Sequence, residues 1–90
     1  MGKETSIVCV VKTTIFGTRN AWSLTLDRDG ETGKEVEVSL QIQGKTAWGF
    51  HLVMSPEGYV TADYHYRSLE EAKADARELF GAEAGDWASP

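Results

Sequence analysis

Apolar and polar residues alternate in several stretches between residues 6 and 66, and the first stretch, residues 6–16, is mostly β-branched or apolar. The alternation is clearest over residues 36–42, where every second residue is Val, Leu or Ile and the residues between them are Glu, Ser and Gln. Because successive side chains of a strand point to opposite faces, this period of two predicts strands with one buried face. Stretches rich in Gly, Asn, Asp and Pro separate them, as is typical of turns. The predicted strands span residues 6–16, 22–26, 36–42, 48–54 and 60–66.

A helical period replaces the alternation after residue 67. Ser68 is followed three residues later by Glu71, which is the spacing of a capping box at a helix start. Gly81 is placed to end the helix in the left-handed conformation. One apolar stripe runs between these two signals, at the spacing that marks the buried side of an amphipathic helix. It consists of Leu69, Ala72, Ala76, Leu79 and Phe80.

Five consecutive strands and one C-terminal helix predict an α+β fold. The simplest arrangement is a five-stranded antiparallel meander sheet with the helix packed on one face. Residues 1–81 form the predicted sheet-plus-helix domain, and residues 82–90 form a C-terminal tail that Trp87 can attach to the body. A helix of this length, ~18 Å, shields two or three strands spaced ~4.8 Å apart. The tail or a second copy of the chain must therefore cover the rest.

Strand registers follow from keeping apolar residues together on one face. In the first hairpin, this rule places Ile15 opposite Trp22 and Thr13 opposite Leu24. In the last hairpin, it predicts an aromatic ladder on the core face. The predicted pairs are Met54 with Val60, Leu52 with Ala62, Phe50 with Tyr64, and Trp48 with Tyr66.

The same register brings His51, Asp63 and His65 together on the outer face. His51 lies opposite Asp63, and His65 lies two residues further along its strand, beside Gly49. Two imidazoles and a carboxylate are ligands for zinc, and a carboxylate can also orient an imidazole for acid–base work. Two solvated histidines on a polar sheet face explain the same residues. The second interpretation is favoured, because an open sheet face lacks the concave pocket that catalysis needs.

Two further candidates for chemistry fail. The loop DRDGET places Asp27, Asp29 and Glu31 at alternate positions, but its glycine comes fourth and strands flank it, so it is not an EF-hand. Cys9 falls on the core side of its strand, which favours a buried thiol acting as a small hydrophobe. The chain also has no Gly-rich phosphate loop, nucleophile elbow or paired-cysteine motif. We therefore expect neither enzymatic activity nor a cofactor.

The first strand is apolar on both faces. If Ile7 and Cys9 face the core, then Val8, Val10 and Phe16 point outwards. As the terminal strand of a meander it also has an edge of unpaired backbone groups. Either the tail folds over this edge, or the edge accepts a partner's strand or a second copy in a homodimer.

Acidic residues give the outer face a negative character. Glu35 and Glu37 lie there, together with Asp27 and Asp63. A solvated face explains them most simply. The alternative is a surface for a basic partner protein, because complementary charge speeds encounter and selects partners.

Composition narrows the class of protein. Ninety residues with 41% hydrophobic and 26% charged residues describe one ordinary globular domain. A net charge of −5 argues against binding to a phosphate backbone, which depends on clustered Lys and Arg. A single cysteine indicates a reducing compartment, and no apolar run has the ~20 residues of a membrane span. We expect a cytoplasmic protein without membrane or nucleic-acid partners.

Three functions follow from the sequence in order of preference. The first is a small non-catalytic interaction module, such as an adaptor, inhibitor or accessory subunit, that binds another protein. The strands-then-helix order is similar in outline to several small single-stranded nucleic-acid-binding domains, which implies binding through an aromatic sheet face as the alternative. A metal or acid–base site at the His51, Asp63, His65 cluster comes third. Residues 48–76 also resemble small sheet-plus-helix domains of bacteria and phages, which brings no site residue.

Overall fold

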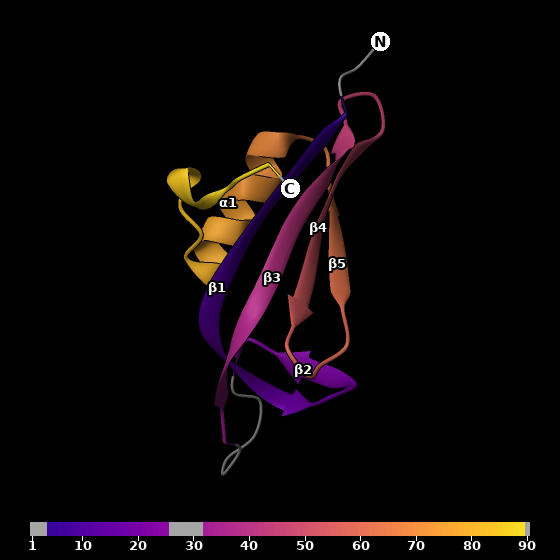
Figure 1. The fold of residues 1–90 in the computed structure, drawn as a ribbon. Helices are drawn as coiled ribbons and strands as arrows, with labels where there is room; N and C mark the ends of the chain where they lie inside the picture. The colour runs from indigo at the N-terminus through magenta and orange to yellow at the C-terminus, as the bar shows by residue number, and fades with distance from the viewer. Residues whose placement is uncertain (1–3, 26–31, 90) are drawn as a thin grey trace.

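The computed structural model describes residues 4–25 and 32–89 of the chain. Five strands precede one α-helix and a short 3-10 turn, which confirms the predicted α+β class (Figure 1). The calcium-like residues Asp27, Asp29 and Glu31 lie outside the described residues. The elements are β1 (Thr5–Thr18), β2 (Ala21–Ser23), β3 (Lys34–Lys45), β4 (Gly49–Pro56), β5 (Ala62–Tyr66), α1 (Leu69–Phe80) and η1 (Ala84–Asp86).

The strand order differs from a simple meander at one point. The sheet runs β2-β1-β3-β4-β5, so the long strand β1 lies between β2 and β3 and is not the terminal strand. Eleven residue pairs, from Thr5 opposite Gly44 to Ile15 opposite Lys34, join β1 to β3. Strand β2 pairs only with residues 16–18 at the far end of β1. Strand β1 therefore has most of its pairs with β3, whose apolar face is long enough to match it, and only three pairs with β2.

The two predicted hairpin registers are each wrong by two residues, although the faces are right. In the first hairpin Gly17, not Ile15, lies opposite Trp22, because only Arg19 and Asn20 separate the two strands. In the last hairpin the pairs are Met54 with Ala62, Leu52 with Tyr64, and Phe50 with Tyr66. A slip of two keeps every side chain on its predicted face, because the side-chain period of a strand is two.

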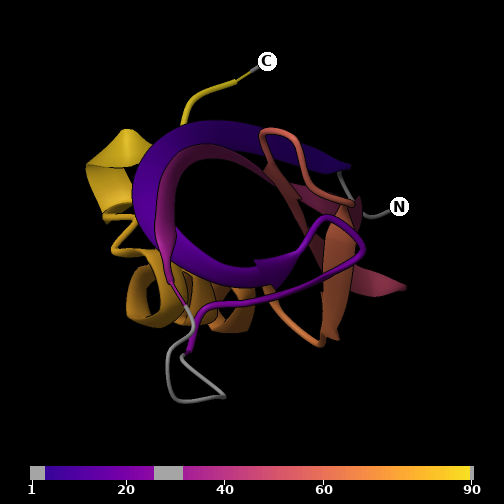
Figure 2. The same cartoon turned by 90° about the horizontal axis from the view of Figure 1, so that it is seen from below.

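The sheet is curled so strongly that its opposite ends touch (Figure 2). The Val60 backbone N–H donates to the Arg19 carbonyl at 2.8 Å, which joins the β4–β5 loop to the β1–β2 turn. The Trp22 indole N–H donates to the Val60 carbonyl at 2.7 Å. These two bonds explain why Val60 does not pair with Met54 as predicted. Its backbone groups are bonded to the other end of the sheet.

The helix begins and ends where the sequence predicts. The Ser68 hydroxyl accepts from the Glu71 backbone N–H at 3.1 Å, and Gly81 ends the helix with φ 73°. The Glu71 carboxylate reaches back to the backbone N–H of Arg67, one residue earlier than a capping box requires. Helix α1 lies across one face of the sheet (Figure 1), with Ala72, Ala76 and Phe80 buried there.

The core lies between this helix and the inner faces of the strands. Val38, Leu40, Ile42, Phe50, Leu52 and Met54 form its centre. Two residues of the predicted aromatic ladder do not belong to it. Trp48 is 75% exposed, because it lies in the β3–β4 turn, where its backbone N–H donates to the Lys45 carbonyl. Tyr64, on β5, is 55% exposed.

The described part of the tail packs on the body, as the sequence allows for Trp87. Ala82 is buried, and the half-buried Trp87 contacts the core. Ala88 then forms a bridge to Val8 in β1. Within the described ranges, the structure has no helix with the length and apolar character needed to cross a bilayer.

The position of Leu40 gives a direct test of the core. Leu40 is 1% exposed at the centre of β3, so Leu40→Ala leaves a cavity and should lower the free energy of unfolding by roughly 2–5 kcal/mol. Urea unfolding followed by circular dichroism measures this. The neighbouring exposed residue provides a control, because Ser39→Ala should change stability by less than about 0.5 kcal/mol. A cost near zero for Leu40→Ala would show that β3 presents its other face to the core.

Candidate functional site

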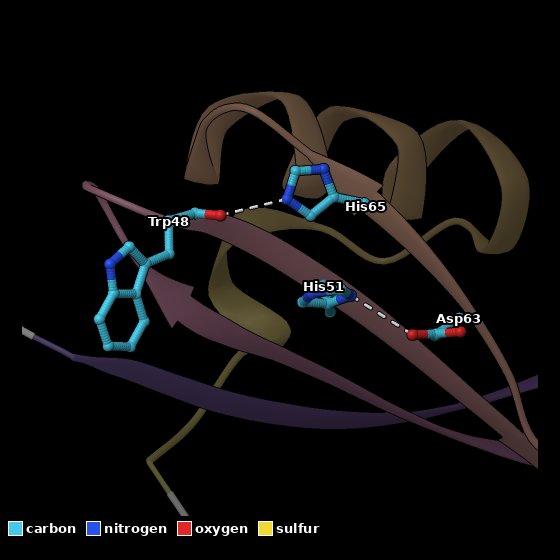
Figure 3. Close-up of polar contacts among 4 residues, drawn as sticks. All are labelled: Trp48, His51, Asp63 and His65. Carbon is cyan, nitrogen blue, oxygen red and sulfur yellow. Dashed lines mark hydrogen bonds and ion pairs between the residues drawn. The ribbon is translucent and has the colours of Figure 1, made fainter.

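The predicted histidine cluster forms on the outer face of β4 and β5 (Figure 3). His51 lies directly opposite His65, and Val53 lies opposite Asp63, so the predicted pairing of His51 with Asp63 is wrong by two residues. The three side chains are nevertheless close. The His51 Nδ1 is 3.3 Å from the Asp63 Oδ2, and the two imidazole rings meet edge to face with centroids 4.9 Å apart.

The donor atoms of this cluster do not point to one place. The His65 Nε2 is 3.2 Å from the Trp48 carbonyl oxygen, so this ring turns away from Asp63 (Figure 3). The ring lies over Gly49, where a Cβ atom would collide with it. In the described part of the chain, no group of three or more His, Cys, Asp or Glu is arranged to hold a metal ion. All three side chains are exposed, and none lines a described cleft.

Cys9 is buried in the core, as its strand position predicts. Burial, with a smaller contribution from the negative charge of Asp86, raises the pKa of the Cys9 thiol. A raised pKa keeps the side chain as an unreactive thiol at neutral pH, because the thiolate is the nucleophile. The geometry therefore agrees with a packing role.

The predicted acidic residues flank the first strand. Glu37 lies opposite Lys12, and Glu35 lies opposite Thr14, with both glutamates exposed. The Glu57 backbone N–H donates to the Glu37 carbonyl, which brings a third acidic residue near. Lys12 and Lys34 line the same shallow depression as these three glutamates. The acidic face is therefore partly neutralised beside β1.

The tail occupies one end of the predicted apolar edge. The Val8 N–H donates to the Ala88 carbonyl at 2.8 Å, and the Ala88 N–H donates to the Val8 carbonyl at 2.9 Å. Phe16, at the other end, is half-buried opposite Ser23 of β2. Of the three apolar residues predicted to point outwards, only Val10 is fully open to solvent, at 62% exposed.

The bond to Ala88 fixes which backbone groups of β1 face this edge. In a regular antiparallel ladder, alternate residues direct both N–H and C=O to the same side. Because Val8 directs both groups towards Ala88, Val10, Lys12 and Thr14 direct theirs to the same edge. Among the residues that the structure describes, none of these groups has a hydrogen-bond partner. We call these three residues the β1 open edge.

The sequence alone did not reveal the limits of this edge. Alternation identified Val10, but Lys12 and Thr14 contribute through their backbone, which carries no sequence signal. The pairing of Val8 with Ala88 joins the two ends of the chain, so no local pattern predicts it. The aromatic Trp87, which contacts the core just before Ala88, was the one available sign.

The comparisons with known proteins add no assignment. No protein-family model, no curated protein and no solved structure matches the chain. The functional argument therefore depends on the geometry of this molecule.

Amide hydrogen exchange measured by NMR tests the open edge directly. We expect the amides of Val10, Lys12 and Thr14 to exchange much faster than those of Cys9, Val11 and Thr13, because the latter three bond to β3. The Val8 amide is the internal control, since it faces the same edge but is bonded to Ala88 and should be protected. Uniform protection along residues 9–14 would mean that another segment covers the edge.

Proposed function

We propose that the protein is a small non-catalytic interaction module that binds an extended segment of a partner protein along the β1 open edge. The observation that supports the proposal is a run of three alternate residues between the bridge to Ala88 and strand β2, whose backbone groups have no partner among the described residues. A partner strand added here would hydrogen-bond to all three. Such strand addition takes affinity from the main chain and specificity from alternate side chains.

The outer side chains of this edge indicate what the added strand carries. Val10 offers an exposed apolar surface, so an apolar residue opposite it would be buried. Lys12 is next to Glu37 on one side and open on the other, so an acidic or neutral residue fits opposite it. The strand thus carries an apolar residue and, two positions away, a residue without positive charge.

Strand β5 lies at one end of the sheet and also has a free edge among the described residues, but it is a poorer template. The same alternation of backbone groups can be followed across β3 and β4 to β5. There, the N–H and C=O groups of Asp63 and His65 point to the edge away from β4. Both are polar, and a charged side chain on a short edge strand discourages pairing. The β1 open edge is longer and has the exposed Val10.

Lys12 also opposes a homodimer through this edge. The symmetric register that uses all three residues pairs Val10 with Thr14 of the second copy and places Lys12 opposite Lys12. Like charges directly opposite one another destabilise a strand pair. The predicted homodimer is therefore less favourable than a complex with a different protein.

Sedimentation velocity over a wide concentration range tests this inference. We expect the mass of one chain throughout, because the symmetric pairing brings two lysines together. The informative variant is Lys12→Ala, which removes that repulsion and should allow at most weak dimerisation at high concentration. A wild-type dimer that Val10→Lys dissociates would instead establish the homodimer.

Capture from a lysate of the source organism, with three variants, tests strand addition. Lys12→Pro removes an edge-facing N–H without removing a bond to β3, so the fold should persist and partner binding should fall at least tenfold. Lys12→Ala keeps the backbone donor and is the matched control. Val10→Lys should also abolish binding, whereas Ala47→Lys adds the same charge in a distant turn and should not.

The captured partner, once purified, must also protect the amides of Val10, Lys12 and Thr14 from exchange. Binding that survives Lys12→Pro in a folded protein would contradict the proposal. Retention that nuclease abolishes would favour the single-stranded nucleic-acid alternative, for which the exposed Trp48 with Lys45 Nζ 4.6 Å from its ring centroid is the relevant surface.

A further inference from the structure

A groove of about 520 Å³ opens between β2, β5 and α1. Its walls come from the Trp22 and Leu24 segment on one side and from Ala62 and Tyr64 of β5 on the other, with Met54 between them. Asp75 and Leu79 of α1 complete it. The groove forms because the curled sheet brings β2 towards β5 (Figure 2), and Tyr64 remains exposed at its wall. It shares no residue with the β1 open edge.

One of the two aromatic walls of the groove is held in place by a hydrogen bond. The Trp22 indole N–H donates to the Val60 carbonyl, which fixes the plane of that ring at one side. Tyr64 extends from β5 on the other side, where its neighbour across the strand is the buried Leu52. Two aromatic side chains beside an aliphatic floor form a surface for a flat or elongated group with apolar character.

One carboxylate lies within this apolar setting. The Tyr66 hydroxyl donates to Asp75 Oδ2 at 2.6 Å and so fixes the orientation of the carboxylate. Burial, followed by the hydrogen bond to Asp75, raises the pKa of Tyr66 above its ordinary value, so this donor keeps its proton at physiological pH. Within the described residues, no nitrogen of Lys, Arg or His lies within 4 Å of Asp75. Among the lining residues that the structure describes, none is basic.

We propose that this groove binds an arginine side chain presented by a partner polypeptide. The methylene stem of arginine packs on apolar walls, its planar guanidinium stacks on aromatic rings, and its N–H groups donate to a carboxylate. Charge complementarity selects this occupant, because Asp75 is the one charged group among the described lining residues and the chain carries a net charge of −5.

A matched pair of probes tests the proposal on the unmodified protein. N-acetyl-arginine amide and N-acetyl-citrulline amide have nearly the same shape, but only the first carries a positive charge. In NMR titrations, we expect the arginine probe to shift the Trp22 indole N–H and the Ala62 and Tyr64 amides in a saturable way. The citrulline probe should bind about tenfold more weakly, which corresponds to about 1.4 kcal/mol.

Two variants test whether the Asp75 carboxylate causes the preference for the arginine probe over the citrulline probe. Asp75→Asn still accepts from the Tyr66 hydroxyl but lacks the charge, so both probes should bind it with equal affinity. Glu78→Gln removes the same charge from an exposed position of α1 outside the groove and should keep the tenfold preference.

Three outcomes would overturn the inference. They are the absence of saturable shifts with the arginine probe, equal binding of the two probes by the wild-type protein, and an equal effect of Asp75→Asn and Glu78→Gln. The last would indicate attraction to the overall negative charge. None of these outcomes depends on the β1 open edge, so the two proposals fail separately.

Discussion

The ladder between β1 and β3 determines which groups of this molecule face the core, the solvent and the edge. Its eleven pairs contain no irregularity, so the alternation of a strand holds without a break from Thr5 to Ile15. Odd-numbered residues of β1 direct side chains inwards and backbone groups to β3. Even-numbered residues direct side chains outwards and backbone groups to the free edge. Burial of Cys9, exposure of Val10 and the open edge at Lys12 are consequences of this single register.

The sequence predicted the faces of the strands more reliably than their partners. Burial of Leu40 and exposure of Ser39 follow from a period of two, because only one face of β3 can contact the helix. The same period cannot distinguish registers that differ by two residues. His65 therefore takes the place opposite His51 that the pattern assigned to Asp63. The candidate cluster was correctly placed on one face, but its internal geometry could not be derived.

The errors have a common physical origin in contacts between distant parts of the chain. The bond from Val60 to Arg19 removes Val60 from the last hairpin, and the bond from Ala88 to Val8 shortens the apolar edge. The first contact depends on the curl of the sheet and the second on the return of the tail to β1, and local propensity encodes neither. Helix α1 was predictable to the residue because its signals at Ser68 and Gly81 act within one turn of the chain.

An open edge normally exposes a protein to pairing with itself, and the residues here limit that risk in a specific way. Lys12 stands at the centre of the open edge, where a symmetric second copy would bring an identical charge, while a different strand with a neutral or acidic residue meets no such cost. The bridge at Val8 and the pairing of Phe16 with Ser23 restrict the opening to three alternate residues. An edge that is short, bounded and charged at its centre retains the capacity to bind one extended segment and resists continued growth into a larger sheet. This combination supports the proposal that the β1 open edge binds a strand of a partner protein and does not pair with further copies of itself.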